Sequence, residues 1–148
     1  MGGSSVALAA NYWTSNTEPA GAGGVGDADV DGYSVSGQVG VNNMKFGGRY
    51  TKHNDRQGRG LDLINWRVGA DYAMGDWSYG VTYQKAAQDR ATGSEDESVY
   101  WSIGASYTVG PGIQFGGGIV GFSYDDDAGN AAAEGENNFG ILWSKFSF

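Results

Sequence analysis

The sequence predicts an all-β chain that forms an antiparallel, transmembrane, up-and-down β-barrel with eight strands in this chain. Eight runs alternate large apolar residues with small or polar ones, and short connections alternate with long ones. Each run of about ten residues has the length of a tilted membrane-spanning strand. The runs cover residues 5–14, 33–41, 44–53, 61–74, 77–87, 99–109, 113–124 and 139–148.

Composition supports one closed β-sheet domain. Glycine accounts for 27 of the 148 residues, well above the usual share of about 7%. Aromatic residues make up 14% of the chain, and both excesses are typical of closed sheets with short turns. No apolar run approaches the roughly 18 residues of a membrane helix. We expect residues 1–4 to be start residues and residues 5–148 to form a single β-barrel domain.

Charge and reactive residues exclude several classes of function. The net charge is −8, and the 9 Lys and Arg residues are scattered, which argues against nucleic acid as a partner. The chain has no cysteine, so it has neither disulfides nor Cys-based metal sites. His53 is the single histidine, and no nucleophile elbow or paired-base motif accompanies it. The sequence therefore predicts that the protein is not an enzyme.

The two kinds of connection predict how the barrel stands in a membrane. Residues 42–43, 75–76 and 110–112 are tight turns rich in Asn and Gly. Residues 15–32, 54–60, 88–98 and 125–138 are long, polar and acidic. An even number of strands then brings both chain ends to the short-turn end, which is the periplasmic end in outer-membrane barrels.

Aromatic residues on the apolar phase gather near both ends of the runs, where amphipathic rings would anchor a barrel at the membrane surfaces. Those near the short turns are Tyr72, Trp77, Tyr79, Tyr107, Phe146 and Phe148, and those near the long loops are Tyr12, Tyr33, Tyr50, Tyr83 and Trp101. Lys52 and Lys85 also fall on this phase near the loops, within reach of lipid headgroups.

The run of residues 113–124 has the least clear phase. Val120 and Phe122 oppose the apolar phase of Ile113, Phe115 and Ile119. We expect a β-bulge near residues 116–118 to reconcile the two halves of this run.

The opposite phase is polar and small, and it carries Lys45, Arg49, Arg67, Asp71 and Lys145. A lipid-facing arginine at the membrane midplane would cost about 2–4 kcal/mol, so this phase is expected to face inward. Two interpretations stay open. The five charged residues either line a wide, water-filled pore with Asp71 as a local partner, or form internal salt bridges that stabilise a closed barrel.

Three segments carry a resemblance to a known family: residues 107–127, with the sequence TVGPGIQFGGG near their start, the strand 65–72, and the terminal residues 145–148. The chain resembles the C-terminal part, or a half-length relative, of a Gram-negative outer-membrane porin of the alphaproteobacterial type. This resemblance implies a location in the cell outer membrane and passive diffusion of small hydrophilic solutes and ions. It also implies that Phe146 and Phe148 form the signal read by the barrel-assembly machinery.

The length of the chain departs from the family. Porins of this type resemble barrels of about sixteen strands, and only eight runs are present here. The chain is therefore expected to be a fragment, a half-barrel or a small natural relative. A half needs another copy or a missing half to complete the sheet, because open edges are not tolerated in lipid.

One acidic segment has part of a calcium-binding pattern. Asp27, Asp29 and Asp31, followed by Gly32, reproduce the first half of a calcium-loop spacing. Gln38 at the twelfth position and the strand that follows exclude a true EF-hand. No cofactor is required, and Ca²⁺ in the acidic loops is an alternative to solvated loop charge.

The expected partners are outer-membrane lipid and lipopolysaccharide, the barrel-assembly machinery and a second copy in a homo-oligomer. The main alternative function is a closed eight-stranded outer-membrane barrel with a structural or loop-binding role and no conductance. A soluble ligand-binding barrel is a third reading, which the asymmetry of the connections and the aromatic chain end oppose.

Overall fold

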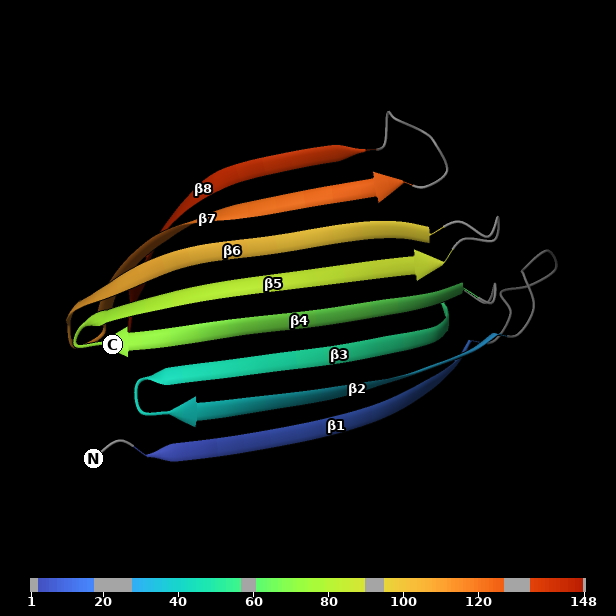
Figure 1. Ribbon diagram of the computed structural model, residues 1–148, viewed down its shortest axis with the longest axis horizontal. Helices are drawn as coiled ribbons and strands as arrows, with labels where there is room; N and C mark the ends of the chain where they lie inside the picture. The colour runs from blue at the N-terminus through green and yellow to red at the C-terminus, as the bar shows by residue number, and fades with distance from the viewer. Residues whose placement is uncertain (1–2, 18–27, 57–60, 90–94, 127–133, 148) are drawn as a thin grey trace.

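The alternating runs form β-strands in the computed structural model, which describes residues 3–17, 28–56, 61–89, 95–126 and 134–147. The strands are β1 (Ser4–Thr17), β2 (Ala28–Val41), β3 (Met44–Arg56), β4 (Leu61–Met74), β5 (Trp77–Asp89), β6 (Glu95–Gly110), β7 (Ile113–Asp126) and β8 (Gly135–Phe146). Each strand pairs antiparallel with the next, so the predicted up-and-down fold class is confirmed (Figure 1). None of the described residues forms a helix long and apolar enough to cross a membrane.

Short turns join the strands at one end of the sheet, where β1 also begins and β8 also ends (Figure 1). Asn42, Gly75 and Gly112 adopt positive φ angles of 54°, 60° and 76° in these turns. Asn and Gly are the residues that enter this region most readily, which explains their place in the turns.

The strands extend further toward the long connections than the apolar runs predict. β1 continues to Thr17, and β2 already begins at Ala28, within the segment expected to be a loop. β1 also begins at Ser4, one residue before the predicted domain start. Backbone pairing needs no apolar side chain once the neighbouring strand is in register, so polar residues continue the ladder.

The bulge predicted near residues 116–118 is wrong. β7 pairs with β6 without a shift from Gln114 to Asp126, and the only irregularity of this pair lies between Thr108 and Gly110. Because strand side chains alternate strictly, Val120 and Phe122 lie on the opposite face from the apolar residues at odd-numbered positions of β7. They therefore share a face with the polar side chains of the neighbouring strands.

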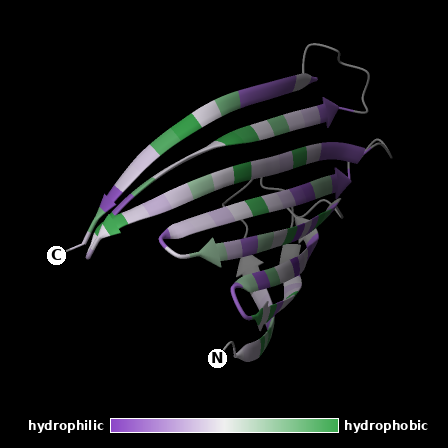
Figure 2. Cartoon of the chain, turned by 60° about the vertical axis from the view of Figure 1, so that its left-hand side comes forward, coloured by the Kyte–Doolittle hydropathy of each residue, from purple (hydrophilic) through white to green (hydrophobic). Residues whose placement is uncertain are grey.

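The sheet curls without closing on itself (Figure 2). Among the described residues, β1 and β8 each pair with one neighbour and make no contact with each other. Ser34 and Ser106 are 2% and 8% exposed, whereas Leu8 and Ile103, on the other phase, are 83% and 55% exposed. Because side chains crowd together on the concave side of a curved sheet, the polar phase is the concave, inner face, and the apolar phase is the convex, outer face.

Replacing Gly75 with alanine should lower the free energy of unfolding by about 1–2 kcal/mol, because a Cβ is strained at positive φ. Gly110→Ala is the matched control. Both sites leave open space for a Cβ, but only Gly75 has positive φ. Urea unfolding from lipid vesicles measures the difference, and equal effects of the two alanines would contradict the turn strain.

Candidate functional site: the inner wall

The predicted pore-lining residues share the inner face. Cross-strand partners point to the same side of a sheet, and Lys45 lies opposite Asp71 while Arg49 lies opposite Arg67. Lys145 on β8 lies opposite Gln114 on β7, near the short-turn end. The structure therefore brings the first four together on β3 and β4 and leaves Lys145 at the far edge of the sheet. Their role as pore-lining residues stays a prediction.

Neutral serine hydroxyls accept side-chain hydrogen bonds on the inner face. The amide of Asn11 and the guanidinium of Arg49 both donate to the Ser34 hydroxyl, at 3.5 and 3.3 Å. The Gln114 amide donates to the Ser106 hydroxyl at 3.0 Å. Lys45, Arg67 and Lys145 form no ion pair with any described residue. These three charges therefore depend on solvent for their stabilisation.

A hollow of about 540 Å³ opens on the inner wall. Its lining includes Lys45 and Asp71 on one side and Ser102, Ile141 and Trp143 on the other. Part of its floor has no side chains, because Asp71 is followed across β5, β6 and β7 by Gly80, Gly104 and Gly118 at the same level. The glycine row keeps this stretch of wall thin.

Large apolar side chains also face inward, which we did not predict. By register they share the polar face, and they include Tyr100, Val120, Phe122, Phe139, Ile141 and Trp143. Only Val120 is buried, at 5% exposed. Strict alternation along residues 113–126 would have identified the two in β7, but we assumed that one face collects all the apolar residues.

The outer face carries two packed groups of aromatic rings. At the short-turn end, Trp77 packs against Tyr79 and Tyr107, with ring centroids 6.0 and 5.0 Å apart. Nearer the long connections, Trp66 on β4 and Tyr83 on β5 lie 5.2 Å apart. Such amphipathic rings suit the two membrane–water interfaces, with the aliphatic band between them in hydrocarbon.

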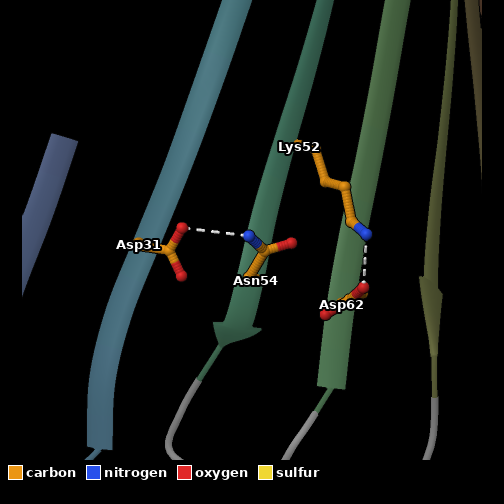
Figure 3. Close-up of polar contacts among 4 residues, drawn as sticks. All are labelled: Asp31, Lys52, Asn54 and Asp62. Carbon is orange, nitrogen blue, oxygen red and sulfur yellow. Dashed lines mark hydrogen bonds and ion pairs between the residues drawn. The ribbon is translucent and has the colours of Figure 1, made fainter. Parts of the chain in front are cut away.

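Polar contacts occupy the outer face at the long-connection end (Figure 3). The Lys52 ammonium lies 2.8 Å from the Asp62 carboxylate, and the Asn54 amide donates to Asp31 at 3.0 Å. Lys85 pairs with Glu97 in the same way. Both lysines thus bind carboxylates of the adjacent strand, and such exposed pairs add little to the stability of the fold.

Some predicted site residues lie outside the described residues. Phe148 and Asp27 are among them. Phe146 lies at the end of β8, with its ring centroid 6.3 Å from that of Phe115 in an edge-on contact. Asp29 and Asp31 lie within β2 and not in a loop. In the described part of the chain, no group of three or more His, Cys, Asp or Glu residues could hold a metal ion.

The single histidine has a packing partner. The His53 ring lies 5.0 Å from the indole of Trp13, and both residues lie at the same level of the inner face, on either side of Gly32. A Cβ at Gly32 would overlap the Trp13 ring, so the glycine makes room for this aromatic pair.

These features define a transmembrane β-barrel protein of the bacterial outer membrane. The sequence matches the Gram-negative porin family over residues 1–140, and the chain belongs to that family. The fold is similar to that of OmpTdeltaL8, a loop L8 deletion mutant of OmpT, an outer membrane protein of Vibrio cholerae. That match has a TM-score of 0.70 and 17% identity, and it covers 95% of this chain and 49% of the other.

The chain thus spans about half the length of that structural relative. Neisserial surface protein A also matches, over 99% of each chain at 16% identity, with a TM-score of 0.33. No curated protein matches the sequence significantly.

An arginine on the outer face should destabilise the protein far more than one on the inner face. Ile103→Arg should lower the free energy of unfolding by about 2–4 kcal/mol, because the charge would enter hydrocarbon near the midplane. Ser102→Arg, on the adjacent residue of the same strand, should change it by less than about 1 kcal/mol. Urea titrations in lipid vesicles measure both, and the reverse order would contradict the assigned faces.

Proposed function

We propose that the protein forms the wall of a water-filled pore through which small hydrophilic solutes and ions diffuse passively across the outer membrane. The inner face supports this proposal. It is polar and glycine-rich, and Lys45, Arg67 and Lys145 have no ion-pair partner among the described residues. Passage needs no catalytic chemistry, because polar wall groups replace part of the hydration that a solute loses in the lumen.

The observation that carries the proposal is the open sheet. A closed eight-stranded barrel is just wide enough for its own side chains to fill, whereas barrels of sixteen or more strands hold an aqueous channel. Here β1 and β8 each have one edge that pairs with no other described strand, and the chain covers 49% of a larger relative. We propose that further strands, from a second copy or from a longer chain, complete a wider barrel in the membrane.

The direction of the edge strands supports such a completion. β1 runs away from the short-turn end and β8 runs toward it, so β8 of one sheet can pair antiparallel with β1 of another. The up-and-down order then continues without a break across the junction. The alternative, a closed eight-stranded barrel without conductance, requires β1 and β8 to pair with each other, and the open sheet favours the pore.

The remaining partners are proposals that follow from the membrane location. The ionic outer surface around Lys52 and Lys85 would meet lipopolysaccharide and lipid headgroups, and Ca²⁺ would bind loop carboxylates there. Phe146 and Phe148 would present the signal for the barrel-assembly machinery. A second copy is proposed as a homo-oligomeric partner.

Planar-bilayer recording tests the pore. The refolded protein should give stepwise single-channel currents, and Arg67→Glu should lower the preference for chloride over potassium severalfold, since a unit charge at about 4 Å changes an ion's energy by about 1 kcal/mol even in water. Lys52→Glu makes the same charge change on the outer face and should shift the reversal potential much less. The absence of any current steps would leave the closed barrel as the better account.

A further inference from the structure

One level of the inner wall combines positive charge with aromatic side chains. Arg49 on β3 lies opposite Arg67 on β4, and the row continues through Gln84, Tyr100 and Phe122 on the next three strands. Neighbouring strands are about 4.8 Å apart, so a small molecule on the wall can contact several members of this row at once.

The two arginines at the basic end of the row have no negatively charged partner among the described residues. Two arginines directly opposite each other repel, and like charges in such cross-strand pairs destabilise a sheet. Arg49 donates to the neutral Ser34 hydroxyl, and neither guanidinium has an ion-pair partner among the described residues. A bound carboxylate would relieve this repulsion, because guanidinium groups bind carboxylates with strong, charge-assisted hydrogen bonds.

The aromatic end of the row is exposed and hollowed. Phe122 is 41% exposed although it faces the polar side of the sheet. A hollow of about 260 Å³ is lined by Arg67, Gln84, Tyr100 and Phe122, together with Ser98. Tyr100 also lines the larger hollow, where the Trp143 ring covers Gly116 and takes the place of a side chain there. The wall therefore offers flat apolar surface beside an unpaired cation.

We propose that this row is a binding site for small aromatic carboxylates. The guanidinium of Arg67 binds the carboxylate, Gln84 and the Tyr100 hydroxyl supply polar contacts, and the Phe122 ring packs against the aromatic ring of the solute. The proposal rests on the proposed pore, because the row must face water for a solute to reach it. It adds a preferred class of solute to passive diffusion.

Binding of benzoate to the refolded full chain in detergent tests the site by saturation-transfer NMR. Arg67→Gln should weaken binding about tenfold through loss of the charged hydrogen bonds. Phe122→Leu should weaken it about fivefold through loss of ring packing. Acetate, which lacks the ring, and benzyl alcohol, which lacks the charge, should bind at least tenfold more weakly than benzoate.

Two outer-face variants are the controls. Lys52→Gln removes the same charge and Phe115→Leu removes the same ring, and both should bind benzoate as the unmodified protein does. Benzoate that enters the micelle contributes equally to every variant, and circular dichroism verifies that each variant is folded. Equal binding by all folded variants, or loss of binding in the control variants as well, would overturn the proposed site.

Bilayer recording of the same samples separates this inference from the pore. Benzoate binding that depends on Arg67 and Phe122, in a protein without current steps, would keep the site and remove the pore. Current steps without benzoate binding would overturn the site and leave the pore in place.

Discussion

Backbone hydrogen bonding at the two edges of the sheet is the constraint on which the rest of the structure depends. Six of the eight described strands have a neighbour on both sides, whereas β1 and β8 each have one edge whose N–H and C=O groups pair with no other described strand. In the hydrocarbon of a bilayer each unpaired group costs several kcal/mol, so such edges persist only if other strands pair with them. The width of the lumen, and with it the function, follows from how the edges are completed.

The sidedness of the sheet follows from the same membrane environment. Outer-face side chains such as Leu8 and Ile103 are exposed in the isolated chain because hydrocarbon, not protein, is their partner. On the inner face, the row of Gly80, Gly104 and Gly118 keeps this stretch of wall thin, and under the proposed function Arg49 and Arg67 would be accessible to solutes. Hydrogen bonds such as that from Gln114 to Ser106 satisfy some of the polar groups on this face, and in the proposed pore lumen water would satisfy the others.

Period-two alternation allowed prediction of the strands, their antiparallel order and the face of Lys45, Arg49, Arg67, Asp71 and Lys145, because alternation assigns each residue to one side of a sheet. It could not show that Arg49 lies opposite Arg67, because which residues of two strands face each other depends on the register between the strands. The prediction was wrong for Val120 and Phe122 because we assumed that apolar residues belong to the lipid face and invoked a bulge in place of strict alternation. A half-barrel with open edges was one of the alternatives that the sequence left open, and the sequence could not choose among them because closure depends on curvature that accumulates over all eight strands.

Amide hydrogen exchange of β1 and β8 in lipid vesicles tests the central claim most directly. If other strands complete the sheet in the membrane, the amides of β1 and β8 should be protected to about the same degree as those of β4 and β5, which already have two neighbours. Edge amides that exchange rapidly in a protein that is inserted and conducting would contradict the account.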